Sequence, residues 1–268
     1  MDSALAIRTA RLTRGIRGIV KRLLPPRAII HLMGLNNYLV GEAEIRALKY
    51  LVDPRRDSID VGCARGAYAY PLSRLSRKVW CFEPLPASFA FLSAAFASKS
   101  NVALYPFAAS DADTEVTLWV PSHDGDAPTV NGFNHGDHAS WTAIKVPARR
   151  LDSVVDADVG LIKIDVEGHE AAVLDGATKL LNRSRPNVVV EVEKRHMEED
   201  PATVFDRLLK LNYRGWFNWE GKLLPVDQFD SAVHQRIENL NVPNRWYANN
   251  FIFTPEEYKA FPPRVRTN

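Results

Sequence analysis

Short apolar runs alternate with segments of helical periodicity along most of the chain. Runs bounded by turn residues predict strands, and apolar residues spaced three or four positions apart predict helices. The expected strands are a run that ends on Asp60 and the ranges 78–84, 102–107, 114–120, 160–165, 186–194, 213–226 as a hairpin, and 249–253. The expected helices cover 41–52, a segment beginning at Ala67, 86–98, 169–181 and 201–211. Because strands that alternate with helices build parallel sheets, the pattern predicts an α/β fold. We expect a doubly wound, mostly parallel seven-stranded sheet of the Rossmann-like type, with an antiparallel C-terminal hairpin.

The turn after the first expected strand carries the most informative polar position. Asp60 ends the apolar run, and Gly62 and Gly66 follow before the helical pattern begins. Glycines keep side chains away from a ligand, and a carboxylate repels a pyrophosphate but suits ammonium and sulfonium groups. The pattern therefore predicts an S-adenosylmethionine site with Asp60, Gly62 and Gly66 as cofactor-binding residues. Another nucleotide, or a plain tight turn, is the alternative.

Polar residues also close the other expected strands. Glu83 follows Asp60 by 23 positions, and Pro84 stops the strand there, so Glu83 is expected to reach the ribose hydroxyls. Ser110 and Asp111 follow the third strand, where an adenine edge would be read, although an Asx turn explains them equally well. Since parallel strands present their carboxyl ends at one edge, six polar residues are expected to face one crevice. They are Asp60, Glu83, Ser110, Asp111, Asp165 and Glu191.

Composition places the chain among ordinary soluble globular proteins. The 268 residues are 46% apolar and 25% charged, and no apolar run approaches the roughly 18 residues that a membrane span requires. Cys63 and Cys81 are the only cysteines, which excludes a disulfide scaffold and favours buried thiols in a reducing compartment. A cytoplasmic location is the expectation.

The formal net charge of +2 is unevenly distributed. Residues 1–27 hold seven Lys or Arg and one Asp, a net charge of +6, which leaves −4 for the rest of the chain. The body is therefore not expected to bind nucleic acid. In 1–27 an apolar stripe opposes the basic residues, which predicts an amphipathic helix that docks on a membrane surface, on a partner or on its own domain.

Four segments follow from these patterns. They are the basic helix at 1–27, a helical lead-in at 28–56, the main domain at 57–258 and a tail at 259–268. Within the main domain, the stretch 121–141 is rich in polar residues and contains His123, His135 and His138. Loops of this length are commonly binding loops, lids or disorder. Because no cysteine accompanies the histidines, solvated side chains are favoured over a zinc site.

Several motifs resemble the FkbM family of S-adenosylmethionine-dependent methyltransferases over roughly residues 57–195. They are the segments 60–66, 82–84, 151–152, 173–177 and, most specifically, 162–170, which reads Ile-Lys-Ile-Asp-Val-Glu-Gly-His-Glu. The resemblance implies a class I methyltransferase fold and an O-methyltransferase acting on sugar or macrolide hydroxyls. One departure is that Cys63 and Ala64 replace the Ala-Asn of the family's usual Gly-Ala-Asn-x-Gly turn.

Methyl transfer to a hydroxyl requires a general base or a metal ion. Asp165 is the first candidate for the base, with Glu191 and His169 beside it at neighbouring strand and helix ends. No metal-ligand set is assigned, although Asp165 with Glu191 would suit Mg²⁺. The expected acceptor is a hydroxyl-bearing small molecule or glycan, and the oligomeric state stays open. A nicotinamide-dependent oxidoreductase and a non-catalytic S-adenosylmethionine-binding module are the alternatives.

Overall fold

A computed structural model describes residues 24–40, 43–121, 128–130, 141–240, 242 and 246–261. Most of the expected N-terminal helix, residues 1–23, lies outside the described residues. So do His123, His135 and His138 of the polar stretch. Predictions about these segments stay predictions. No described helix is long and apolar enough to cross a membrane.

The main sheet has eight strands in the order β10-β9-β11-β8-β7-β1-β2-β3. From β8 to β3 neighbouring strands are parallel, whereas β11 pairs antiparallel with both β8 and β9, and β9 pairs antiparallel with β10. The bounds are β1 (Asp57–Val61), β2 (Val79–Phe82), β3 (Val102–Tyr105), β7 (Val159–Ile164), β8 (Asn187–Glu191), β9 (Tyr213–Trp219), β10 (Lys222–Pro225) and β11 (Asn250–Pro255). This confirms the expected mostly parallel α/β fold, and the C-terminal hairpin supplies the eighth strand.

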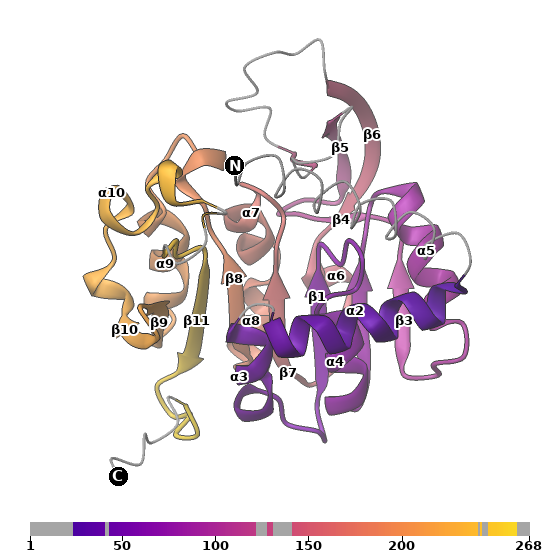
Figure 1. The fold of residues 1–268 in the computed structure, drawn as a ribbon, viewed down its shortest axis with the longest axis horizontal. Helices are drawn as coiled ribbons and strands as arrows, with labels where there is room; N and C mark the ends of the chain where they lie inside the picture. Colours follow the sequence, from indigo (N-terminus) through magenta and orange to yellow (C-terminus); the bar gives the residue numbers. More distant parts are fainter. Residues whose placement is uncertain are drawn as a thin grey trace, which may run out of the picture.

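A second sheet of three strands rises above the main one at the top of the view (Figure 1). It contains β4 (Ala108–Ala109), β5 (Thr114–Pro121) and β6 (Trp141–Arg149), in the order β4-β6-β5. The sequence pattern predicted the strand at 114–120 but not its partner β6. Most side chains of β6 are exposed or half-buried, so its sequence lacks a clear alternation, and its pairing with β5 fixes it.

Helices cover both faces of the main sheet. One face packs α2 (Pro26–Val40), α3 (Ala43–Leu51), α4 (Ala69–Leu75) and α5 (Pro86–Phe96). The other packs α6 (Leu151–Val154), α7 (Glu170–Asp175), α8 (Thr178–Ser184) and α9 (Ala202–Leu209). Short elements complete the chain, namely η2 (Lys194–His196), η3 (Val226–Gln228), α10 (Ser231–His234) and η4 (Ile237–Asn239).

The single helix expected over 169–181 is instead two helices, α7 and α8. The chain turns at Gly176, where a Cβ atom would lie 1.9 Å from the carbonyl oxygen of Ser110. Periodicity alone did not reveal this break, because the apolar spacing continues through it. The glycine is required by the close approach of the segment that follows β4.

The alternation of side chains along β7 separates the two apolar cores. Ile162 and Ile164 pack with the helices α6 to α9, whereas Leu161 belongs to the core under α3 and α4. Lys163 points to the same face as Leu161 and is fully buried. A buried lysine needs charged or polar partners, and they come from the neighbouring strand ends.

The turn after β1 lies against the end of β7 without any intervening side chain. Gly62 has a φ of +79°, and a Cβ atom there would lie 1.8 Å from the backbone carbonyl oxygen of Asp165. Its N–H donates to the carbonyl of Phe82, which ties the same turn to β2. Gly62 is therefore required both for its backbone conformation and for its lack of a side chain.

Replacing Gly62 by Ala is expected to reduce the free energy of unfolding by roughly 3 kcal/mol or more. The left-handed conformation costs a non-glycine residue roughly 1–2 kcal/mol, and displacing the Asp165 carbonyl adds an overpacking cost. Gly221 is the matched control, since its φ is +75° and a Cβ atom there would meet nothing within 4 Å. Gly221→Ala should cost only about 1–2 kcal/mol. Equal losses in urea denaturation of the two variants would contradict the packing argument.

Candidate functional site

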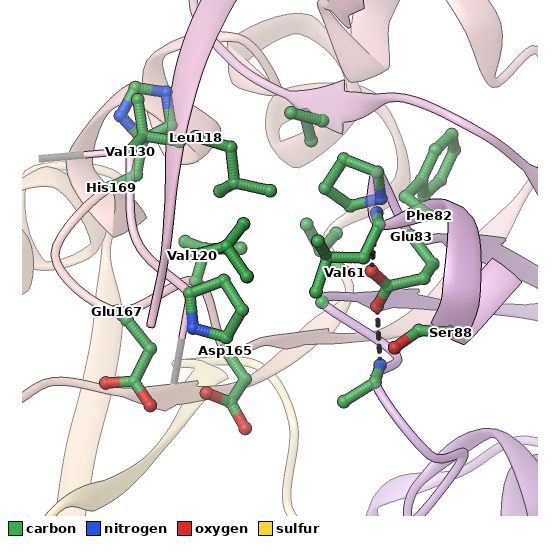
Figure 2. A pocket seen from close by; sticks show the side chains of 18 of the residues that line it. Val61, Phe82, Glu83, Ser88, Leu118, Val120, Val130, Asp165, Glu167 and His169 are labelled. Atoms are coloured by element: carbon green, nitrogen blue, oxygen red, sulfur yellow. Dashed lines mark hydrogen bonds between the residues drawn. The ribbon is translucent and has the colours of Figure 1, made fainter. Parts of the chain in front are cut away.

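A cavity of about 520 Å³ opens at the carboxyl ends of β1, β2 and β7. Its walls come from four sources: the turn after β1, the segment after β2, the segment after β7, and the apolar inner side of the small sheet. The lining residues that the argument uses are Gly62, Ala64, Arg65, Glu83, Leu118, Val120, Asp165, Glu167 and His169. Figure 2 shows Glu83 and Ser88 on one side of this space, with Glu167 and Asp165 on the other. The position agrees with the rule that open α/β sheets bind ligands beyond their strand ends.

Glu83 lines the cavity and also braces it. Its Oε2 accepts a hydrogen bond from the N–H of Ala64 at 2.7 Å, and its Oε1 accepts one from the N–H of Leu85 at 2.8 Å. Burial raises the pKa of Glu83, although these two backbone hydrogen bonds oppose the change. A carboxylate oxygen has a second lone pair, so each oxygen can still accept from a ligand hydroxyl.

The turn that Glu83 braces contains a strained residue. Ala64 has a φ of +44°, a conformation that Asn adopts more readily than Ala. This is the position at which the family motif usually has Asn. The backbone N–H of Ala64 donates to Glu83 in this conformation.

Asp165 follows β7 and lines the cavity beside a buried positive charge. Its Oδ2 lies 3.7 Å from Lys163 Nζ, and Oε2 of Glu191 lies 3.8 Å from the same nitrogen. Lys163 also donates to Oδ1 of Asn250 at 3.0 Å, and its ammonium lies 4.8 Å from the ring centroid of Tyr68. One buried ammonium thus contacts polar side chains at the ends of β7, β8 and β11.

The Mg²⁺ alternative placed a cation between Asp165 and Glu191. The Lys163 ammonium already lies within 4 Å of both carboxylates, and a divalent ion there would be repelled by a buried fixed charge. Glu191 also accepts a hydrogen bond from Asn249 at 2.6 Å and is not among the residues that line the cavity. The residues present do not suit a magnesium site at this pair.

Asp60 is buried away from the cavity. Its side chain lies on the face of β1 that is opposite Val61, next to Lys163 in the parallel register. Burial raises its pKa to about 7, while Lys163 acts in the opposite direction. Asp60 is not among the residues that line the cavity, and its expected contact with a cofactor stays a prediction.

His169, Ser110 and Asp111 form a hydrogen-bonded chain. Ser110 Oγ lies 3.0 Å from Oδ1 of Asp111, to which it donates, and 2.9 Å from Nε2 of His169. In that arrangement Nε2 carries the proton and Nδ1 of His169 is an acceptor. Burial lowers the pKa of His169, against the charge of Asp111, which favours the neutral ring. Only His169 of the three lines the cavity.

Of the six strand-end residues, two line this cavity. They are Glu83 and Asp165, whereas Asp60, Ser110, Asp111 and Glu191 are not among its lining residues. Gly62 also lines it. Gly66 is not a lining residue. A Cβ atom there would lie 2.7 Å from Ile30 and 3.1 Å from Leu92, so the glycine allows close packing against α2 and α5.

Two features of the site were missed by sequence reasoning. Glu167 lines the cavity and has a φ of +51°, and Leu118 and Val120 of β5 form its apolar wall. The clustered acids of the 162–170 segment were a signal for Glu167. The alternation of β5 predicted a strand, but it gave no information on which sheet or cavity that strand would cover.

The family model of the FkbM methyltransferase domain matches residues 60–215 of this chain. No curated protein matches the sequence. Among solved structures, a methyltransferase FkbM from Methylobacillus flagellatus is 17% identical with a TM-score of 0.48, covering 91% of this chain and 60% of that one.

Other similar structures belong to methyltransferases of different kinds. An rRNA methylase from Streptococcus thermophilus is 14% identical with a TM-score of 0.42, covering 80% of this chain and 95% of that one. A precorrin-6y C5,15-methyltransferase from Geobacter metallireducens is 13% identical with a TM-score of 0.43, covering 81% of this chain and 89% of that one. Because all three similarities are low, no substrate or residue role is carried over from them.

Glu170 begins α7 and holds the loop that carries Asp165 and Glu167. Both of its carboxylate oxygens accept from the N–H of Gly168, at 2.9 and 3.1 Å. Burial raises its pKa to about 7 from a reference of 4.5, with further contributions from Glu167 and Asp165. The folded protein therefore binds this proton more tightly than the unfolded chain.

The contribution of Glu170 to the free energy of unfolding should therefore decrease as pH rises from about 4.5 to 7, because the carboxyl loses its proton. We compare the free energy of unfolding of the wild type with that of Glu170→Gln. The difference between the two proteins should favour the wild type by on the order of 2–3 kcal/mol more at pH 4.5 than at pH 8. Urea denaturation of both proteins at the two pH values measures the difference. Glu115→Gln, at an exposed position of β5, is the control and should show no such change. A pH-independent difference for Glu170→Gln would contradict the raised pKa.

Proposed function

The chain belongs to the FkbM methyltransferase family, and from this premise we propose that it is an S-adenosylmethionine-dependent O-methyltransferase. The acceptor is a hydroxyl group on a small molecule or glycan. The observation that carries the proposal is the cavity at the strand ends, with Glu83 on one side and Asp165 on the other. We assign the first carboxylate to the donor and the second to the acceptor.

The charges of the cavity wall support a cationic donor. Glu83, Asp165 and Glu167 line it, and Arg65 is the one fully charged basic side chain among the described lining residues. S-adenosylmethionine carries an ammonium and a sulfonium, which this wall attracts. The pyrophosphate of a nicotinamide cofactor and the backbone of a nucleic acid would both be repelled. The same charges therefore disfavour the oxidoreductase alternative.

Transfer is an in-line displacement in which the acceptor oxygen attacks the methyl carbon and the sulfur leaves with its bonding electrons. Holding the three atoms collinear supplies much of the rate. The acceptor hydroxyl must also lose its proton. Asp165 is assigned this role because it lines the cavity, and Lys163 at 3.7 Å balances its charge.

His169 is the second candidate for the base. Its Nε2 contact with Ser110 leaves Nδ1 as an acceptor, and the ring is neutral when its pKa is lowered. Glu191 is assigned a supporting position, because it contacts Lys163 and Asn249 rather than the cavity. A non-catalytic binding module would need neither Asp165 nor His169 at the wall.

Glu83→Gln is expected to weaken binding of S-adenosylhomocysteine by about 10- to 100-fold. Charge-assisted hydrogen bonds to the ribose contribute roughly 1.5–3 kcal/mol each, and the amide removes the charge. One of the two backbone N–H partners also loses its acceptor, so the melting temperature should decrease. Calorimetric titration measures the affinity. Glu115→Gln is the surface control, and unchanged affinity in a folded Glu83→Gln protein would exclude the ribose assignment.

Asp165→Asn should bind S-adenosylhomocysteine within a few-fold of the wild type yet lose turnover by about 10²- to 10⁴-fold. The amide preserves the shape but cannot accept the proton. Transfer of labelled methyl groups to a panel of hydroxyl compounds measures turnover. His169→Gln is the comparison variant. Normal turnover by Asp165→Asn together with loss in His169→Gln would move the base assignment to His169.

A further inference from the structure

Three metal-ligating side chains gather behind the wall of the cavity. They are Glu167 from the loop after β7, Glu193 just after β8, and His196 in η2, and one ligand atom of each lies within 4.8 Å of the others. Nε2 of His196 and Oε2 of Glu167 are 2.9 Å apart. The three residues come from two neighbouring strand ends, so the cluster joins the segments that follow β7 and β8.

The two segments hold these side chains in a fixed frame. The N–H of His196 donates to the carbonyl of Glu193 at 3.0 Å, and Oε1 of Gln235 accepts from the N–H of Lys194 at 2.8 Å. On the other side, a Cβ atom on Gly168 would lie 2.4 Å from the carbonyl oxygen of His196. The loop that carries Glu167 is therefore pressed directly against η2.

The imidazole of His196 lies beside Glu167 in a buried position. His196 is only 9% exposed, and its Nε2 is buried and makes no hydrogen bond, although the Glu167 oxygen is 2.9 Å away. A simple ion pair would align a ring N–H with that oxygen. An imidazole nitrogen and a carboxylate oxygen at this separation can both bind one cation.

Glu193 has one acceptor position left for such a cation. Arg195 donates to both of its oxygens, at 2.6 and 3.1 Å, and the hydroxyl of Tyr247 donates at 2.8 Å. A carboxylate offers about four lone-pair sites, so three are used and one remains. The arginine fork orients the carboxylate, as outer partners of metal ligands commonly do.

We propose that Glu167, Glu193 and His196 bind one divalent ion of a first-row transition metal, such as Mn²⁺ or Zn²⁺. An imidazole beside two carboxylates favours these ions over Mg²⁺, which prefers oxygen ligands throughout. With Arg195 included, the ionised site carries a net charge of −1 before the metal binds, so a divalent cation is attracted. The site is separate from Asp165 and Glu191, whose charges are balanced by Lys163.

Glu167 places the ion at the wall of the cavity, because the same side chain lines it. An acceptor hydroxyl in the cavity can then complete the coordination, which holds its oxygen and lowers its pKa. This role rests on the proposed function, whereas metal binding itself does not. The two are therefore measured separately.

The test uses full-length protein freed of metal with a chelator and titrated calorimetrically with Mn²⁺, Zn²⁺ or Mg²⁺. One equivalent of Mn²⁺ or Zn²⁺ should bind, at least tenfold more tightly than Mg²⁺, and should raise the melting temperature. His196→Ala and Glu167→Gln should each weaken binding at least tenfold. Glu198→Gln, an exposed acid two residues beyond His196, is the matched control and should bind like the wild type.

Absence of binding by folded wild-type protein, or unchanged binding by both variants, would overturn the proposal. If His196→Ala does not fold, Glu167→Gln decides, because it keeps the shape of the side chain. A parallel titration with S-adenosylhomocysteine separates the two hypotheses. If the wild-type protein does not bind S-adenosylhomocysteine, the proposed function is wrong. If it does not bind Mn²⁺ or Zn²⁺, the proposed metal site is wrong.

Discussion

The close approach of the turn after β1 to the end of β7 is the constraint on which the site depends. Gly62 has a positive φ, and its α-carbon lies so near the carbonyl of Asp165 that no side chain fits between them. Its N–H also donates to Phe82, so three parallel strands meet at one residue. The same turn presents Ala64 to Glu83. The two sides of the cavity are therefore fixed relative to each other by backbone contacts rather than by flexible side chains.

A second constraint is the charge of Lys163 beneath that turn. A buried ammonium is tolerated only when polar groups replace its hydration, and here the ends of β7, β8 and β11 provide them. The arrangement leaves Asp165 at the cavity with its charge balanced. It also holds Glu191 against Lys163, and Glu191 is not among the residues that line the cavity. The acids of the site thus include some that line the cavity, some that pair with Lys163, and some that lie around His196.

Sequence reasoning found the residues whose role depends on their place at a strand end. The fold class, the glycine turn, and the positions of Glu83 and Asp165 at the cavity followed from apolar runs that close on polar residues. It could not show that Asp60 is almost fully buried next to Lys163, because that position depends on the register between β1 and β7. It also placed Ser110 at the main sheet, whereas the residue follows a strand of the small one.

The sequence by itself determined the local elements, the family and the residue types at the strand ends, because these depend on periodicity and on short motifs. Only the tertiary structure decided which acids share a space. Glu167 and His196 are 29 positions apart, and no pattern along the chain links them. They meet because β7 and β8 are neighbours in the sheet and because Gly168 allows its loop to press against η2. Contacts between segments distant in sequence arise from packing of the whole fold, which local spacing does not encode.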